Sequence, residues 1–427
     1  MTSFDLISYI QNGKLDNTLI ELYGHAQLED QKSRYISAIT EFATLYGSDR
    51  EISLFSVSGR SELSGNHTDH NHGCVIAASV NLDILAVASA RNDAKIRVKS
   101  EGYDEITVDI SKYNTPDSDL FGTSDSIIAG MCRGFADKGY VTGGFDAYMT
   151  SSVLKGSGLS SSAAFEVMIG NIENHLYNSG TVDNVEIAKL AQYAENVFFG
   201  KPCGLMDQVA CAHGGIVAID FCDTSAPNIQ PMSFDLTKKG YKLCIVDTGG
   251  NHADLTDDYS AIPSEMKAVA KYFGKDVLRD VKKSDVVASI PALRKKLGDR
   301  AILRAIHFFS ENSRVALQKK ALEENDLELY FEYVIESGRS SFCYLQNVYT
   351  SKNVREQGLS LALALAQDYL SDKDGAFRVH GGGFAGTIQA YVKDEDADGF
   401  KDLMSSAFGD GACLVLQIRR DGAIKII

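Results

Sequence analysis

Apolar residues recur at helical spacing in several parts of the chain. Residues 31–46 place five of them on one face: Tyr35, Ile39, Phe42, Ala43 and Tyr46. This spacing predicts a helix, and Gly47 stands at the position where helices commonly end. The same pattern predicts further helices at residues 166–175, 185–199, 264–275, 299–322, 326–345 and 398–408. Residues 359–370 fit both a strand and a helix, and their alanines favour the helix.

Shorter runs of apolar residues predict strands. They lie at residues 52–57, 75–90, 241–246, 387–392 and 413–418. Residues 75–90 fit either a pair of buried strands or one long bent strand. Because strands alternate with helices along the chain, we expect an α+β or α/β protein with two lobes.

The length of the chain indicates how it is divided. A chain of 427 residues is too long for one simple core and indicates two domains. The best candidate for a linker is residues 222–231, which hold two of the six prolines together with Asp, Ser and Asn. We therefore expect an N-terminal lobe at residues 1–222 and a C-terminal lobe at residues 223–427.

Composition narrows the range of partners. The chain has 42 Lys and Arg against 57 Asp and Glu, and the net charge of −15 argues against a basic nucleic-acid-binding surface. No run reaches the ~18 apolar residues of a membrane span, and residues 1–14 lack the pattern of a signal peptide. The eight cysteines form no CxxC pair, which is typical of reduced thiols. We expect a cytoplasmic monomer or weak oligomer that binds small molecules, not nucleic acid or membrane.

Residues 59–73, GRSELSGNHTDHNHG, are dense in short side chains that donate and accept hydrogen bonds. Such a loop suits a polyhydroxylated ligand, which needs both kinds of group. A solvated structural loop is one alternative. A metal site at His67, His70 and His72 is another, but no cysteine lies nearby and the spacing matches no common zinc pattern. We therefore expect no structural metal at these histidines.

Three further segments carry candidate chemistry. Residues 155–164, KGSGLSSSAA, lie at a predicted strand-to-helix junction, where glycines, serines and a helix N-terminus suit phosphate. This segment is neither a Walker A loop nor a GxGxxG motif. Residues 380–386, HGGGFAG, hold more glycines than a turn needs. In residues 203–208, CGLMDQ, Asp207 has apolar neighbours, and a carboxylate there is costly unless it is paired.

Taken in this order, the four segments resemble the GHMP family of small-molecule kinases, and within it the galactokinases. The first resembles the signature G-R-x-N-L-I-G-E-H-T-D-Y-N-x-G, and the second the phosphate loop G-x-G-L-S-S-S-A. The third resembles G-G-G-F-G-G, and the fourth the C-G-I-M-D-Q segment. The resemblance covers roughly residues 45–420 and includes residues 144–146 and 298–314. It implies a two-lobed α+β fold and transfer of the γ-phosphoryl group of ATP, with Mg²⁺, to the C1 hydroxyl of galactose.

The resemblance also assigns roles by motif position. Arg60 and Asp207 match the catalytic pair, in which the arginine stabilises the transferring phosphoryl group and the aspartate meets the sugar hydroxyl. The positions that match sugar contacts are Asn66, His67, Asp69, Gly204 and Tyr259. The positions that match the phosphate loop are Gly156, Ser157, Gly158, Leu159, Ser160, Ser161 and Ser162. Ser162 and Glu195 match the magnesium ligands.

The chain departs from these motifs in several places. Ser58 and Leu154 replace prolines, Ala385 replaces a glycine, and His70 replaces a tyrosine. Asn66 stands where galactokinases carry the glutamate that meets the C6 hydroxyl. We therefore expect galactose as substrate, with sugars modified at C6 accepted better than usual.

Two other functions compete with this prediction. One keeps the mechanism and changes the sugar, to a uronic acid, an arabinose or an N-acetylhexosamine. The other is a sensor that binds galactose and ATP without turnover. Such sensors lack two residues of the Ser-Ser-Ser-Ala-Ala loop, which is complete here at residues 160–164. Both Arg60 and Asp207 are present as well, so the sequence favours an enzyme.

Overall fold

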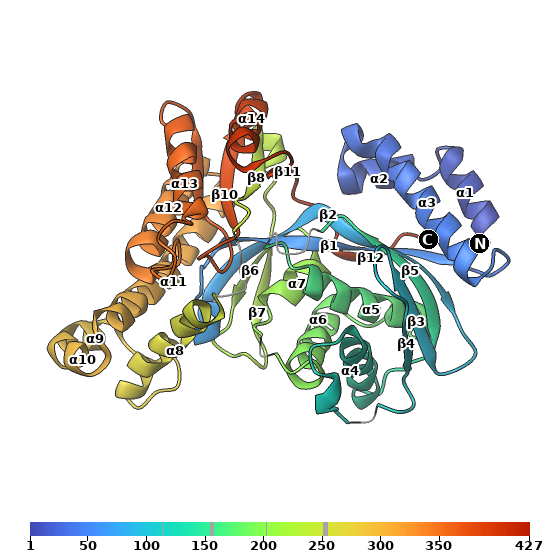
Figure 1. Cartoon of the computed structure of the whole chain (residues 1–427), viewed down its shortest axis with the longest axis horizontal. Helices are drawn as coiled ribbons and strands as arrows, with labels where there is room; N and C mark the ends of the chain where they lie inside the picture. Colours follow the sequence, from blue (N-terminus) through green and yellow to red (C-terminus); the bar gives the residue numbers. More distant parts are fainter. Residues whose placement is uncertain (114, 154–157, 202, 251–254) are drawn as a thin grey trace.

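The computed structural model describes residues 1–113, 115–153, 158–201, 203–250 and 255–427. Within these ranges the chain has an α+β fold built on an eight-stranded and a four-stranded sheet (Figure 1). The candidate residues of the first, second and fourth motifs come from the larger sheet and its helices. The third motif comes from the smaller sheet.

The larger sheet has the strand order β12-β1-β2-β5-β3-β4, and β6 and β7 extend it from β2. Its strands are β1 (Ser53–Ser64), β2 (Cys74–Ala90), β3 (Lys95–Ser100), β4 (Ile106–Asp109), β5 (Phe145–Ser151), β6 (Ile216–Asp220), β7 (Asn228–Met232) and β12 (Ala423–Lys425). β2 is one long strand, which decides between the two predictions for residues 75–90. Its first part pairs with β6 and its last part with β5.

Helices cover both faces of this sheet (Figure 1). One face carries α4 (Ser124–Asp137), α5 (Ser161–Tyr177), α6 (Asn184–Tyr193) and α7 (Met206–His213). The other carries α1 (Ser3–Gln11), α2 (Asp16–Tyr23) and α3 (Leu28–Tyr46). Alternate residues of β1 enter the two cores: Phe55 packs with α4–α7, and Leu54 with α1–α3. Because both faces are covered, β1 and β2 are buried along almost their whole length, with little alternation between buried and exposed residues.

The smaller sheet is antiparallel, in the order β11-β8-β10-β9. Its strands are β8 (Tyr241–Asp247), β9 (Gly375–Val379), β10 (Thr387–Lys393) and β11 (Cys413–Leu416). The helices of this part are α8 (Thr256–Tyr272), α9 (Lys283–Ala288), α10 (Ile290–Leu297), α11 (Asp299–Glu323), α12 (Leu327–Ser340), α13 (Gly358–Tyr369) and α14 (Ala397–Phe408). The ambiguous residues 359–370 are therefore helical, as their alanines suggested.

The expected linker at residues 222–231 overlaps β7, which pairs with β6 in the larger sheet. Reading the whole segment as a linker was wrong. Pro231 is tolerated because β7 lies at an edge, where one side of the strand has no ladder to lose. A lobe boundary at residues 222/223 stays a prediction.

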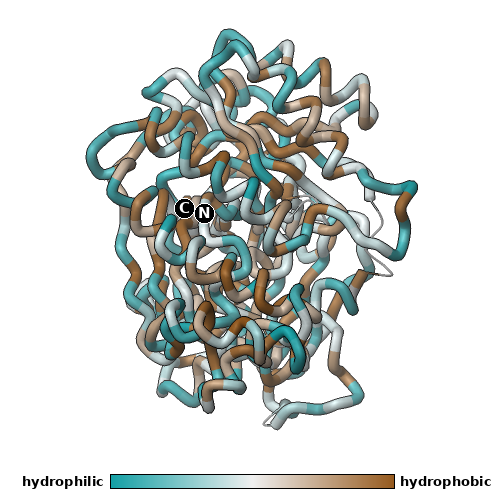
Figure 2. Tube along the Cα trace, turned by 90° about the vertical axis from the view of Figure 1, so that its left-hand side faces the viewer, coloured by the Kyte–Doolittle hydropathy of each residue, from teal (hydrophilic) through white to brown (hydrophobic). Residues whose placement is uncertain are grey.

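The two ends of the described chain lie side by side, in Figure 1 and in the rotated view of Figure 2. The Ile52 N–H donates to the Met1 carbonyl at 3.0 Å, and the Leu54 N–H donates to the Ile427 carbonyl at 3.0 Å. β12 pairs with β1 through Phe55 and Lys425. Both ends are thus fixed beside the strand that carries Arg60. In the described ranges, every helix is too short or too polar to cross a membrane.

Candidate active site

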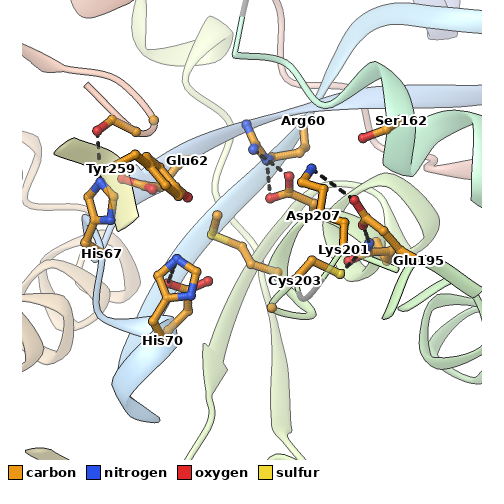
Figure 3. Close-up of a pocket in the computed structure, with 16 residues that line it drawn as sticks. Arg60, Glu62, His67, His70, Ser162, Glu195, Lys201, Cys203, Asp207 and Tyr259 are labelled. Carbon is orange, nitrogen blue, oxygen red and sulfur yellow. Dashed lines mark hydrogen bonds and ion pairs between the residues drawn. The ribbon is translucent and has the colours of Figure 1, made fainter. Parts of the chain in front are cut away.

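A cavity of about 180 Å³ lies where β1 and α7 of the larger sheet face α8 and the loop between β9 and β10. Arg60 and Asp207 lie at its centre (Figure 3). His67, His70 and Tyr259 gather on one side of this pair, and Ser162, Glu195 and Lys201 on the other. The cavity has the size for a small molecule, with chemically different groups at its two ends.

Arg60 and Asp207 form a two-pronged ion pair. Arg60 Nε donates to Asp207 Oδ1 at 2.7 Å, and its Nη2 donates to Oδ2 at 2.7 Å. The Ser160 hydroxyl donates to the same Oδ2, and Arg60 Nη1 donates to the Gly158 carbonyl. Burial alone would raise the pKa of Asp207, but the charge and hydrogen bonds of Arg60 outweigh it and lower the pKa. Asp207 is therefore ionised and held in one orientation.

The local structure explains why these two residues meet. Arg60 lies on β1, whose backbone approaches the second motif: the Arg60 N–H donates to the Leu159 carbonyl at 3.1 Å. A side chain at Gly59 would put its Cβ 3.0 Å from that carbonyl, so glycine permits the approach. Asp207 lies in the first turn of α7, where the positive end of the helix dipole favours a carboxylate.

Four predicted sugar contacts line one end of the cavity: His67, Asp69, Gly204 and Tyr259. His67 Nε2–H donates to the Gly382 carbonyl at 2.9 Å, which fixes the tautomer of the ring because a carbonyl only accepts. Burial lowers the pKa of His67 to about 4, and the neighbouring His70 adds to the effect. The imidazole is therefore neutral at pH 7. Its ring lies 5.3 Å from the Tyr259 ring, centroid to centroid.

Gly204 permits the Asp69 carboxylate to reach the cavity wall. A Cβ at Gly204 would lie 2.5 Å from Asp69 Oδ2, which is closer than two such atoms can approach. Any side chain at residue 204 would therefore displace Asp69. Gly382 plays a similar part for Tyr259, whose ring would lie 2.7 Å from a Cβ there.

Asn66 does not line the cavity, in contrast to the expectation that it faces a ligand hydroxyl. Its side chain is fully buried. Its Nδ2 donates to the Gly381 carbonyl at 2.7 Å, and its Oδ1 accepts from Asn347 Nδ2 at 2.9 Å. These partners hold the amide behind the cavity wall. The motif position alone could not reveal this, because Gly381 and Asn347 are distant in the sequence.

The predicted phosphate loop is described only in part, since Gly156 and Ser157 lie outside the described residues. Ser162 lines the cavity, whereas Gly158, Leu159, Ser160 and Ser161 lie beside it at the start of α5. Ser160 has a left-handed backbone (φ 58°), which turns the chain sharply into the helix. The N-terminus of a 17-residue helix thus opens at this end of the cavity, an arrangement that suits phosphate.

Glu195 lies opposite Ser162, in a π-helical turn (Ala194–Phe198). Lys201 Nζ donates to Glu195 Oε1 at 3.1 Å, and Gln208 Nε2 donates to Glu195 Oε2 at 2.9 Å. The same Gln208 nitrogen donates to Glu166 at 3.1 Å. Burial, together with the Glu195 charge, raises the pKa of Glu166 to about 8. The pair of Ser162 and Glu195 offers two oxygen ligands that suit Mg²⁺, which takes its remaining ligands from water and phosphate.

Several residues of the cavity wall were not among the predicted site residues: Glu62, His70, Lys201, Cys203, Met206, Gln208, Gly381 and Gly382. Gly381 and Gly382 belong to the third motif, so their glycine content was the available signal. Lys201 carries no such signal, because only the fold places its ammonium group beside Glu195. Within the described part of the chain, no group of three His, Cys, Asp or Glu side chains has the arrangement of a metal site.

Comparison with protein families gives two matches. The model described as "GHMP kinases N terminal domain" matches residues 126–215, which hold Ser162, Glu195 and Asp207. The model described as "Galactokinase galactose-binding signature" matches residues 40–90, which hold Arg60, His67 and Asp69.

Curated relatives match along most of the chain. The galactokinase of Streptomyces coelicolor is 32% identical over 372 residues, which are 86% of this chain and 91% of that protein. The galactokinase of Actinobacillus pleuropneumoniae serotype 3 is 29% identical over 373 residues, 87% of this chain and 93% of that protein.

Solved structures of kinases superpose on most of this chain. Lactococcus lactis galactokinase, solved in complex with galactose, superposes with a TM-score of 0.76 at 25% identity, covering 92% of this chain and 100% of that one. A mevalonate kinase, 13% identical with a TM-score of 0.61, covers 86% of this chain and 99% of its own, and shares the fold alone.

Proposed function

This chain belongs to the galactokinase family of GHMP kinases, and from that membership we propose that it phosphorylates galactose at C1 with ATP. The observation that carries the proposal is the Arg60–Asp207 pair at the centre of the cavity, with both side chains fixed by two hydrogen bonds. A phosphoryl-transfer site needs this kind of positioning and charge more than it needs a covalent intermediate.

The reaction forms a bond between the C1 oxygen and the γ-phosphorus and breaks the bond between that phosphorus and the β–γ bridging oxygen. The bond electrons leave with ADP, and the hydroxyl proton passes to Asp207. Because Arg60 lowers the pKa of Asp207, the carboxylate is a weak base. Asp207 therefore orients the hydroxyl first and takes its proton late, as suits a loose transition state. Arg60 stabilises the charge on the transferring group.

The sugar lies at the end of the cavity lined by His67, Asp69, Gly204 and Tyr259. Neutral His67 and ionic Asp69 offer hydrogen bonds to several hydroxyls of a neutral polyol at once. Tyr259 adds an apolar ring face, which suits the C–H face of a sugar.

The triphosphate lies at the other end, where the start of α5 directs free N–H groups and the helix dipole at the cavity. We place the β- and γ-phosphates beside residues 158–162, the described part of the segment that resembles the phosphate loop. Ser162 and Glu195 are the residues that would hold Mg²⁺, which neutralises phosphate charge when bound. Lys201, now paired with Glu195, is placed to pair with a phosphate oxygen instead.

We further propose that the protein is cytoplasmic and that it is a monomer or a weak oligomer. All eight cysteines are free, and two of them, Cys222 and Cys343, are exposed, which suits a reducing cytoplasm. A monomer or weak oligomer stays a prediction, and size-exclusion chromatography with light scattering tests it.

The function is tested by ADP release from purified protein with ATP and Mg²⁺ and a panel of hexoses, pentoses and uronic acids. Galactose is expected to give the highest kcat/KM, with galactose 1-phosphate as the product by phosphorus NMR. Turnover of another sugar in preference to galactose would refute the assignment of the substrate.

The metal ligands are tested separately with Glu195→Gln. We expect the Mg²⁺ concentration for half-maximal rate to rise at least tenfold, because the variant loses a charged ligand. Glu332→Gln, on the exposed side of α12, is the matched control and should leave that concentration unchanged. An unchanged Mg²⁺ dependence in Glu195→Gln would refute its role as a ligand.

A further inference from the structure

The sugar end of the cavity contains a carboxylate that the motif assignment does not use. Glu62 lies on β1 two residues after Arg60, so both side chains leave the same face of the strand. Two residues advance a strand by roughly 7 Å. Glu62 lines the cavity near His67 and Tyr259, on the side away from the phosphate end (Figure 3).

Glu62 and Asn66 contact each other. Asn66 Nδ2 donates to Glu62 Oε1 at 3.2 Å. The amide of Asn66 is also engaged by Gly381 and Asn347 and is fully buried, so it has no group left for a ligand. Of the two side chains, only Glu62 reaches the cavity.

Compared with the galactokinase signature G-R-x-N-L-I-G-E-H, the two residue types are exchanged. This chain reads G-R-S-E-L-S-G-N-H from Gly59 to His67, with Glu at residue 62 and Asn at residue 66. The signature has Asn at the first of these positions and Glu at the second. Because the two side chains touch, the exchange keeps one carboxylate and one carboxamide in the same small volume.

The surroundings hold the Glu62 carboxylate in one orientation. The guanidinium of Arg378, which is fully buried, donates to Glu62 Oε1, the oxygen that also accepts from Asn66. Within the described residues, the hydrogen bonds to this carboxylate thus end on one oxygen. Oε2 is left as the acceptor for a bound hydroxyl.

A sugar bound with its C1 hydroxyl at Asp207 extends along β1 toward Glu62. The hydroxyls at the far end of the ring, at C4 and C6, then lie nearest to Oε2. We propose that Glu62 is a specificity-determining residue that binds a far-end hydroxyl of the sugar, and that Asn66 supports it from behind. The proposal rests on the proposed function, because it requires the sugar to be oriented by Asp207.

The experiment compares kcat/KM for galactose, 6-deoxygalactose and 4-deoxygalactose in the wild type and in Glu62→Gln. A hydrogen bond to a charged group changes affinity by roughly 10- to 100-fold. We expect Glu62→Gln to lower the preference for galactose over at least one of the two deoxy sugars by tenfold or more. The KM for ATP should stay within twofold, since Glu62 lies at the opposite end of the cavity.

A smaller change in both preferences would overturn the proposal. If Glu62→Gln does not fold, as judged by circular dichroism, Glu62→Asp decides in its place. That variant keeps the charge for Arg378 but withdraws the carboxylate from the cavity, and the same tenfold criterion applies. If the wild type turns over none of the three sugars, the proposed function fails instead, so the two failures are distinguishable.

The exchange itself is tested by a double variant. Asn66→Glu alone places a second carboxylate against Glu62 and removes the donor to Gly381, so we expect loss of most galactose turnover. Adding Glu62→Asn restores one carboxylate and one carboxamide, and kcat/KM for galactose should rise at least tenfold above that of Asn66→Glu. A double variant no better than Asn66→Glu would show that the two positions are not interchangeable and overturn the supporting role of Asn66.

Discussion

Glu173 makes the stability of the larger-sheet half depend on pH, and its replacement by Gln should remove that dependence. Glu173 lies on α5 with no exposed surface. Its carboxylate accepts from the Gly143 N–H at 3.2 Å and contacts Cys132 Sγ at 3.5 Å. In the described part of the chain no salt bridge reaches it. Burial without a cation raises the pKa of Glu173 from 4.5 to about 8.

The sign of the effect follows from which state holds the proton. Between pH 4.5 and about 8 the folded protein keeps the Glu173 proton and the unfolded chain releases it, so stability falls as pH rises. Each pH unit in this window costs about 1.4 kcal/mol. From pH 5 to pH 8 the loss from this one group amounts to roughly 3 to 4 kcal/mol. Gln cannot ionise, so Glu173→Gln should escape the loss.

The assay is urea unfolding followed by far-ultraviolet circular dichroism at pH 5, 6, 7 and 8. The variant and the wild type should have similar midpoints at pH 5, and the variant should become progressively more stable as pH rises. Glu332→Gln is the control, because this glutamate is exposed on α12. A difference between Glu173→Gln and wild type that does not grow with pH would refute the reasoning.

Three other substitutions test the catalytic centre. Arg60→Lys should lower kcat more than tenfold, because an ammonium cannot make both hydrogen bonds to Asp207. Circular dichroism should show an intact fold. A near-normal kcat would show that only the positive charge of Arg60 is needed. Asp207→Asn should lower kcat by about 10²–10⁴-fold while calorimetry still detects galactose binding, and a residual rate above a tenth of wild type would contradict its role. Gly204→Ala should raise the KM for galactose about 10- to 100-fold, because the added Cβ displaces Asp69. The KM for ATP is the internal control. An unchanged KM for galactose would show that Asp69 does not contact the sugar.

The fold was predictable from sequence wherever the hydrophobic period was long and regular. The helix at residues 31–46 follows from local pattern alone, and the structure begins it at Leu28. The apolar run at residues 75–90 predicted buried β-structure but left open whether it forms one strand or two, and the structure has one strand from Cys74 to Ala90. The segment at residues 222–231 was misread because its prolines and polar residues resemble a linker. These residues can still form the strand β7, because β7 hydrogen-bonds to β6 on one side and needs no backbone donors on its other side.

The centre of the site was predictable from sequence because its two residues each lie in a short recognisable motif. Arg60 and Asp207 each lie in a recognisable segment, and the structure brings them together although 147 residues separate them. Asn66 was predicted to face the ligand because it stands at a sugar-contact position of the first motif. Its actual orientation depends on Asn347 and Gly381, whose proximity arises only when the third motif folds against the first. Contacts of this kind have no signature in the local sequence.

The pairing of β12 with β1 constrains the order in which a newly made chain can mature. The strand that bears Arg60 is synthesised early, but its neighbour on one side lies at residues 423–425, almost the whole chain later. Until that segment has been translated, β1 presents an open edge to other strands, which is a recognised route to aggregation. Joining residues so far apart also adds to the entropic barrier of folding. The strand that bears Arg60 is thus among the first parts to be made and among the last to gain its full set of neighbours.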